Sequence, residues 1–92
     1  MAEIRYTEEF LRRYKELPLS IQKKAERREK LFHENPYHSS LKTEKLQPAE
    51  REYWSFRVDR NYRIIFRFGG NNTIYFITCG HHNWIYRYLL SH

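Results

Sequence analysis

Three arginines in the C-terminal half of the sequence have the chemistry to bind phosphate. Arg57 lies in residues 53–58, and Arg63 and Arg67 lie in residues 62–68, two segments in which polar and apolar residues alternate. In strands, this alternation places the three arginines on one face, opposite the aromatic residues. Guanidinium groups hold phosphate oxygens through forked hydrogen bonds. The plainer interpretation, which the arginines by themselves favour, is a set of solvated charges on the open face of a half-buried sheet.

A second group of residues, His81, His82 and Tyr86, can transfer protons. Histidine titrates near neutral pH, and a tyrosine on the next helical turn can position or donate a proton. Cys79 precedes the two histidines, but the spacing lacks the paired ligands of a structural zinc site. Histidines that are merely packed or exposed to solvent are the alternative.

The elements that position these residues follow from periodicity and turn residues. Thr7 is placed as a helix N-cap, Pro18 ends the first helix, and Asn35 with Pro36 ends the second. Residues 69–72, Gly-Gly-Asn-Asn, predict a hairpin turn, because glycine and asparagine tolerate positive φ. The expected elements are a strand around 4–6, helices at 8–17 and 20–33, an irregular segment at 37–52, strands at 53–58, 62–68 and 74–78, and a short helix at 83–90.

This order predicts an α+β fold, in which an N-terminal strand and an α-helical hairpin pack on an antiparallel β-sheet meander with a short C-terminal helix. Strand parity places Trp54, Phe56 and Tyr62 on the apolar face, as core residues against the hairpin. Gly80 is expected to break the last strand.

Composition and charge limit the class of protein. The 92 residues are expected to form one domain, 1–92, with 17% aromatic residues to build a thin core. Seventeen basic and eleven acidic residues give a net charge of +6, so a polyanion or an acidic protein surface is the natural partner. A single cysteine, no apolar signal region and no membrane-length apolar run indicate a cytoplasmic protein. Glycine-rich phosphate loops and Cys-x-x-Cys pairs are absent, which predicts no cofactor.

Four stretches of the chain carry a family pattern. They are residues 4–18, from Ile-Arg-Tyr-Thr-Glu-Glu-Phe to Leu-Pro; Leu46 followed by Tyr-Trp-Ser-Phe-Arg-Val at 53–58; Asn-Tyr-Arg-Ile-Ile-Phe at 61–66; and 77–87, from Ile-Thr-Cys-Gly-His-His to Tyr-Arg. Their order and spacing resemble the RelE/ParE superfamily of bacterial toxins from type II toxin–antitoxin systems, over nearly the whole chain. The resemblance implies one of two activities, because RelE-like members cut mRNA, usually in the ribosomal A site, whereas ParE-like members poison DNA gyrase.

The resemblance to the RelE-like branch implies a catalytic set. Arg63, in a Tyr-Arg-hydrophobic context, matches the arginine that holds the scissile phosphate, and Arg57 matches a basic residue of the preceding strand. Glu44, two residues before Leu46, matches a glutamate that some members use as general base, although by its residue type alone it is an ordinary loop charge.

His82 and Tyr86 match the histidine or tyrosine that serves as the C-terminal acid. The chain departs from the family here, because members with a closely similar ending often carry His-Asp where this chain has His82 and Asn83. The mechanism implied is metal-independent cleavage, in which an activated 2′-hydroxyl attacks the adjacent phosphate. Four further residues are expected to steer the RNA backbone: Lys42, Lys45, Arg67 and His81.

The partners implied are a cognate acidic antitoxin, mRNA and the ribosome, with operator DNA bound only through the antitoxin. The antitoxin is expected to cover the Arg57/Arg63 face or to displace the C-terminal tail. Two alternatives stay open: a ParE-like inhibitor of DNA gyrase, in which the same arginines are structural or contact acidic protein, and an inactive antitoxin-binding module. Retention of the whole acid–base set favours the mRNA interferase.

Overall fold

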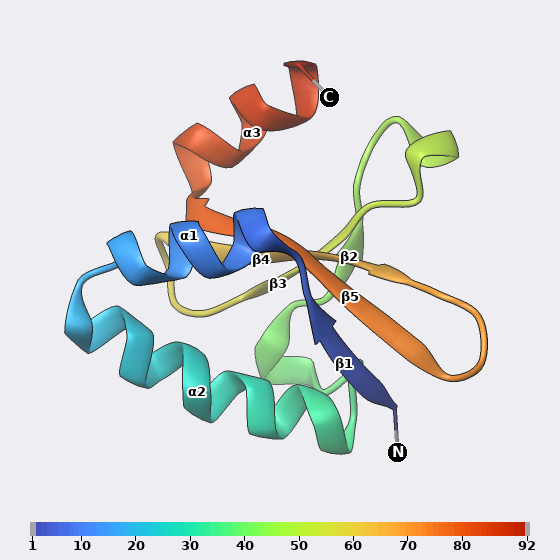
Figure 1. The fold of residues 1–92 in the computed structure, drawn as a ribbon, viewed down its shortest axis with the longest axis horizontal. Helices are drawn as coiled ribbons and strands as arrows, with labels where there is room; N and C mark the ends of the chain where they lie inside the picture. Colours follow the sequence, from blue (N-terminus) through green and yellow to red (C-terminus); the bar gives the residue numbers. More distant parts are fainter. Residues whose placement is uncertain (1, 92) are drawn as a thin grey trace.

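The computed structural model describes residues 2–91, without the side chains of residues 86 and 89–91. Its main elements are β1 (Glu3–Tyr6), α1 (Glu8–Glu16), α2 (Leu19–Glu34), β2 (Glu44–Lys45), β3 (Trp54–Arg57), β4 (Tyr62–Phe68), β5 (Thr73–His81) and α3 (His82–Ser91). The strands form a five-stranded sheet in the order β1-β5-β4-β3-β2. β1 runs parallel to β5 and the other pairs are antiparallel. The predicted α+β fold, a helical hairpin on a meander, is confirmed (Figure 1).

The helical hairpin begins and ends at the predicted residues. Thr7 caps α1, because its hydroxyl accepts a hydrogen bond from the backbone N–H of Phe10 at 3.0 Å. The same hydroxyl donates to the carbonyl of Ile77 at 2.8 Å, which ties the start of α1 to β5. Pro18 separates the two helices, and Asn35 is the C-cap of α2. Local sequence therefore determines the length of both helices.

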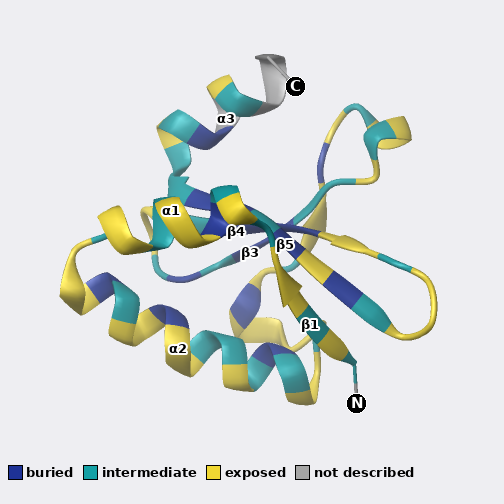
Figure 2. Ribbon diagram, viewed as in Figure 1, coloured by how far each residue is buried: buried dark blue, intermediate teal, exposed yellow. Residues whose placement is uncertain are grey.

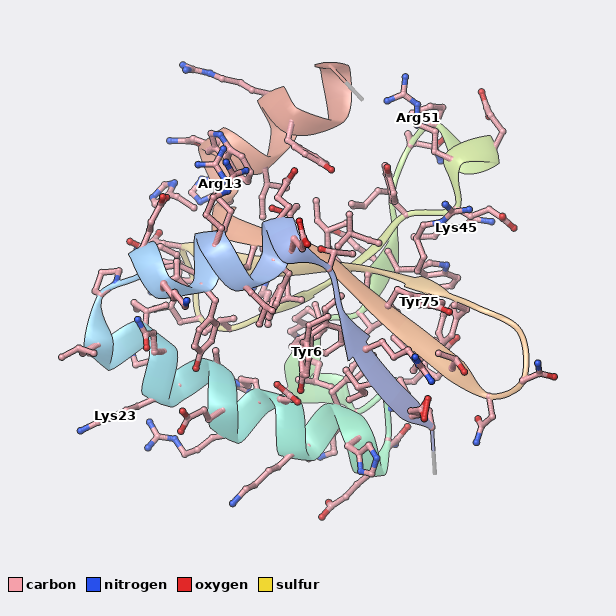
Figure 3. The ribbon with its side chains drawn as sticks, in the orientation of Figure 1. Tyr6, Arg13, Lys23, Lys45, Arg51 and Tyr75 are labelled. Carbon is pink, nitrogen blue, oxygen red and sulfur yellow. The ribbon has the colours of Figure 1, made fainter. Side chains whose placement is uncertain are left out.

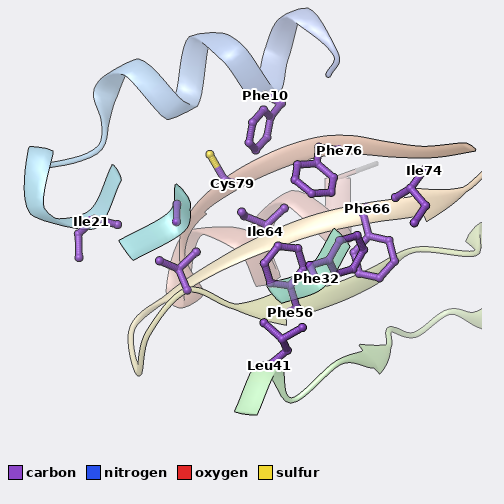
Figure 4. Packing of buried hydrophobic residues seen from close by; sticks show 12 residues of the cluster. Phe10, Ile21, Phe32, Leu41, Phe56, Ile64, Phe66, Ile74, Phe76 and Cys79 are labelled. Atoms are coloured by element: carbon purple, nitrogen blue, oxygen red, sulfur yellow. The ribbon is translucent and has the colours of Figure 1, made fainter. Parts of the chain in front are cut away.

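The main core lies between the hairpin and one face of the sheet. Four phenylalanine rings meet there with no exposed surface, and those of Phe32 and Phe56 stack with centroids 4.6 Å apart (Figure 4). The predicted core positions are confirmed, since Phe56 is fully buried and Trp54 and Tyr62 pack against the same cluster. Aromatic rings thus form the centre of the core that stabilises this small sheet.

The opposite face of the sheet was expected to be open, and this expectation is wrong. A second, smaller cluster forms there between Ile65 of β4, Ile85 of α3 and Leu46 of the loop after β2. The three side chains are at most 8% exposed. α3 and α2 lie on opposite sides of the strands, with α1 level with the strands between them (Figure 1), and buried positions recur along the middle of the sheet (Figure 2).

Three local expectations also change. β5 does not end at Gly80 but continues to His81, because β4 continues beside it and pairs Tyr62 with His81. The segment expected to be irregular contains β2 and two short 3₁₀ turns. In the hairpin turn, Asn71 and Asn72 take positive φ and the glycines do not. No helix within residues 2–91 is long and apolar enough to cross a membrane.

Candidate functional site

Strand register arranges the candidate residues in two adjacent rows on the α3 side of the sheet. The first row crosses three strands, with Arg57 of β3 opposite Arg63 of β4 and Arg63 opposite Gly80 of β5. The second row crosses four strands and contains Glu44, Ser55, Ile65 and Thr78. Residues in register share a face of the sheet. Glu44 and the two arginines therefore project to the same side, as the catalytic set requires.

The two opposed arginines are more buried than expected. The Arg63 side chain is only 11% exposed, so its guanidinium is not the free group that a solvated surface arginine would present. The Nε atoms of Arg57 and Arg63 are both buried and have no hydrogen-bond partner among the described residues. Like charges directly opposite each other destabilise a sheet, and a buried unpaired donor adds to that cost. An anion bound between the guanidinium groups would offset both costs.

Glu44 is the carboxylate nearest to this pair. Its Oε1 atom lies 3.9 Å from Nη1 of Arg63, at the outer limit of an ion pair, and its side chain is 53% exposed. The contact is too long for a hydrogen bond. Glu44 therefore lies beside the arginine pair without forming a hydrogen-bonded ion pair with it, and its carboxylate remains open to solvent and to a substrate.

The start of α3 places His82 at the same end of the sheet. Its backbone N–H donates to the carbonyl of Asn61 at 2.8 Å, and its ring Nδ1 lies 3.4 Å from the same oxygen. Asn61 belongs to the turn that precedes Arg63, so the turn and the helix start are tied together. The His82 ring stacks on that of His81 with centroids 4.6 Å apart. The predicted acid thus lies at the end of the sheet that carries Arg57 and Arg63.

His81 has a structural contact that the sequence did not suggest. It immediately precedes α3, and its Nδ1 accepts a hydrogen bond from the backbone N–H of Asn83 at 3.2 Å. This contact caps the helix, as a side-chain acceptor does at an N-terminus. An acceptor at Nδ1 assigns the ring proton to Nε2 in the neutral form. The Tyr86 side chain lies outside the described residues.

The remaining expected RNA-binding residues lie away from the arginine pair. Lys45 alternates with Glu44 and so projects to the other face, where its Nζ is 6.0 Å from the centroid of the Trp54 ring. Lys42 is exposed after the first 3₁₀ turn. Arg67 lies on the arginine face, and its Nη2 is 3.5 Å from a carboxylate oxygen of Glu52. The structure places Glu44, Arg57 and Arg63 together on one face of the sheet and His82 at the end of the sheet where the arginines lie, whereas these three cations lie away from the arginine pair.

Two buried hydroxyls of the site were missed from the sequence. Ser55 and Thr78 are fully buried on the second row, and their hydroxyl oxygens have no hydrogen-bond partner among the described residues. Ser55 lies two residues before Arg57 in the same strand, so alternation predicts that both side chains project to the same face. Only the packing of α3 shows that this face is covered. Within residues 2–91, no three His, Cys, Asp or Glu side chains gather closely enough to hold a metal ion.

Comparisons with known proteins agree with this architecture. A family model described as the ParE-like toxin domain matches residues 19–84, whereas no curated protein matches. The structure of YafQ from E. coli strain BL21(DE3) is similar with a TM-score of 0.75 at 18% identity, covering 94% of this chain and 99% of that one. The YoeB/ParE toxin from Agrobacterium tumefaciens has a TM-score of 0.71 at 20% identity, covering 87% of this chain and 98% of the other.

A third similar structure is a chain of the RelB–RelE antitoxin–toxin complex from Methanococcus jannaschii. Its TM-score is 0.71 at 26% identity, covering 90% of this chain and 95% of that chain. The family match extends over well over half of the sequence and includes Glu44, Arg57, Arg63 and His82. The chain therefore belongs to the ParE-like toxin domain family, and the predicted resemblance to RelE/ParE toxins is confirmed.

Proposed function

We propose that the protein is the toxin of a toxin–antitoxin pair and that it inhibits translation by cleaving mRNA on the ribosome without a metal ion. The observation that carries this proposal is the directly opposed, largely buried pair Arg57 and Arg63, with the Glu44 carboxylate 3.9 Å from Arg63. Two guanidinium groups held side by side fit the two free oxygens of a phosphodiester. A carboxylate next to such a clamp is placed to accept a proton.

The reaction that fits this geometry is transfer of the phosphodiester to the neighbouring 2′-oxygen. Glu44 takes the proton of the 2′-hydroxyl, whose oxygen attacks phosphorus. Arg57 and Arg63 stabilise the added negative charge of the phosphorane. The bond to the 5′-oxygen then breaks, and protonated His82 gives its proton to that oxygen. The products are a 2′,3′-cyclic phosphate and a free 5′-hydroxyl, so the transfer consumes no water.

An acidic antitoxin is the protein partner of this proposal. The net charge of +6 favours an acidic segment, and one structurally similar chain was solved in an antitoxin–toxin complex. Such a segment is expected to be partly disordered when free and to fold on binding. Purification of the tagged chain from its native operon should recover a small acidic companion. Recovery of the lone chain from that operon would contradict this part of the proposal.

Growth arrest and RNA cleavage by Arg63 variants test the activity. Arg63→Ala should lower cleavage in a translating extract by roughly a hundredfold or more, because a contact that strengthens in the transition state is lost. Arg63→Lys should restore part of the rate, because an ammonium group cannot form the forked contact. The matched control is Arg5→Ala, since Arg5 lies in β1 at the other edge of the sheet and pairs with Glu3.

Products should carry 5′-hydroxyl ends, which sequencing of RNA ends detects. Full cleavage by a folded Arg63→Ala protein would show that Arg63 does not hold the scissile phosphate. Growth arrest by the wild-type protein without any RNA cleavage, but with inhibited gyrase supercoiling, would instead assign it to gyrase inhibition.

A further inference from the structure

The indole of Trp84 packs directly on the backbone of Gly80, and this packing contact, the Trp84 seat, lies beside the arginine pair. Gly80 is in register with Arg63, so a side chain at position 80 would lie on the same face as the clamp. A Cβ atom there would be 2.9 Å from Cε3 and 3.3 Å from Cζ3 of Trp84. The six-membered ring of the indole therefore occupies the space that any other residue at position 80 would need.

The same indole is held by α1. The guanidinium carbon of Arg13 lies 4.3 Å from the centroid of a Trp84 ring, a distance typical of a cation–π contact. Arg13 projects from α1 toward α3 (Figure 3) and lies 3.6 Å from the Glu16 carboxylate, one turn further along its own helix. Trp84 is thus contacted by Gly80 of β5 and by Arg13 of α1, two elements other than its own helix.

This seat is one of the contacts that place the first turn of α3 beside the arginine pair. His82 is the first residue of α3, two positions before Trp84, and Ile85 anchors the next position on Ile65. The backbone of His82 is already held at Asn61. The first turn of α3 is therefore held at three places: His82 at Asn61, Ile85 at Ile65, and Trp84 at Gly80. Of these contacts, the one between Trp84 and Gly80 sets how closely this turn approaches β5.

We propose that Gly80 and Trp84 are positioning residues for the reaction, which hold the first turn of α3, and with it His82, in place relative to the phosphate that Arg57 and Arg63 bind. This inference rests on the proposed function. Neither residue touches the substrate. Gly80 acts by allowing the close approach of the indole, and Trp84 acts by orienting the helix that carries the acid.

The substitution Gly80→Ala tests the seat, because its methyl group forces Trp84 away from β5. A shift of about 1 Å in a catalytic group costs up to roughly a hundredfold in rate, so kcat for mRNA on programmed ribosomes should fall by about tenfold to a hundredfold. KM should stay nearly constant, because Arg57 and Arg63 remain in place. Gly70→Ala is the matched control, since Gly70 has negative φ and open space around the added Cβ.

A second substitution separates positioning from general damage to the fold. Trp84→Phe removes one ring of the indole and leaves room for a methyl group at position 80. The double variant Gly80→Ala/Trp84→Phe should therefore recover most of the kcat lost in Gly80→Ala. If each substitution merely damaged the fold, the kcat losses of the two single variants would combine in the double variant instead.

The NMR signals of the two tryptophan indole N–H groups report the contact between Gly80 and Trp84 without any reaction. Gly80→Ala should shift the signal of Trp84 and leave that of Trp54, which belongs to the other face, unchanged. An unshifted Trp84 signal, an unchanged kcat beside a shifted signal, or a double variant as slow as Gly80→Ala would each overturn the proposal. Absence of cleavage by the wild-type protein would contradict the proposed function, whereas the indole signals would still show whether Gly80 seats Trp84.

Discussion

Arg57 and Arg63 face each other directly across β3 and β4, and both bury Nε without a hydrogen-bond partner among the described residues. Opposed like charges in a sheet cost about 0.2–1 kcal/mol, and unpaired buried donors add to this. An arrangement that destabilises the free protein but fits an anion is typical of a binding site, where stability is given up for function.

Inorganic phosphate should raise the melting temperature of the wild-type protein, because a ligand that binds only the folded state stabilises it. In Arg63→Gln this increase should disappear, while the melting temperature without phosphate should be unchanged or higher, since the like-charge repulsion is removed. Thermal unfolding at constant ionic strength, with chloride as reference salt and Arg5→Gln as control, measures both effects. A phosphate response that persists in Arg63→Gln would place anion binding elsewhere.

Glu44→Gln should abolish most cleavage and leave stability intact. Loss of a general base lowers rates by about 10²–10⁴-fold, whereas Glu44 is half exposed and makes only a long contact to Arg63. Glu52→Gln is the matched control, because Glu52 is also an exposed glutamate paired with an arginine of β4, at 3.5 Å from Arg67. Equal rates for the two variants would remove Glu44 from the mechanism.

Phe56→Ala should cost about 3–5 kcal/mol of unfolding free energy, because it leaves a cavity under the stacked ring of Phe32. For so small a domain this loss approaches the total stability. Urea titration of Phe56→Leu, which keeps part of the volume, provides a measurable intermediate. Phe68→Ala, at a ring that is 42% exposed, should cost clearly less. Equal costs at positions 56 and 68 would contradict the assigned core.

Alkaline pH should destabilise the protein through Cys79. Burial raises the pKa of the Cys79 thiol from its ordinary 9.0 to about 12. Because the folded-state pKa is the higher one, the protonated thiol contributes stability that is fully present below about pH 9. That contribution is lost as the pH rises toward 12.

Cys79→Ala should therefore show a shallower loss of unfolding free energy between pH 9 and 12 than the wild type. Tyr88, whose pKa is also raised to about 12 by burial and by Glu9, contributes to the slope that remains. At pH 8 a thiol reagent should label Cys79 at the rate of unfolding. Rapid labelling of the folded chain would show that the thiol is accessible.

The helical hairpin and the strands of the meander could be predicted because their signals are local. The Thr7 cap, the Pro18 break and the alternation of residues in 53–58 and 62–68, which only Ile65 interrupts, depend on neighbours within a few positions. The same alternation placed Arg57 and Arg63 on one face. Their identity as a directly opposed pair depends on strand register, which the turn at residues 59–61 determines.

The sequence by itself determined the fold class, the aromatic face, the excess of positive charge and the residue types of the candidate site. Only the tertiary structure decided that α3 covers the second face, that Glu44 and Lys45 project to opposite sides, and that β5 passes through Gly80. The physical reason is contact range. Periodicity reports which face a residue occupies, whereas coverage of that face depends on elements distant in sequence, such as Ile85 against Ile65 and Arg13 against Trp84. No local pattern encodes those contacts, so the burial of the arginines could be seen only in the folded chain.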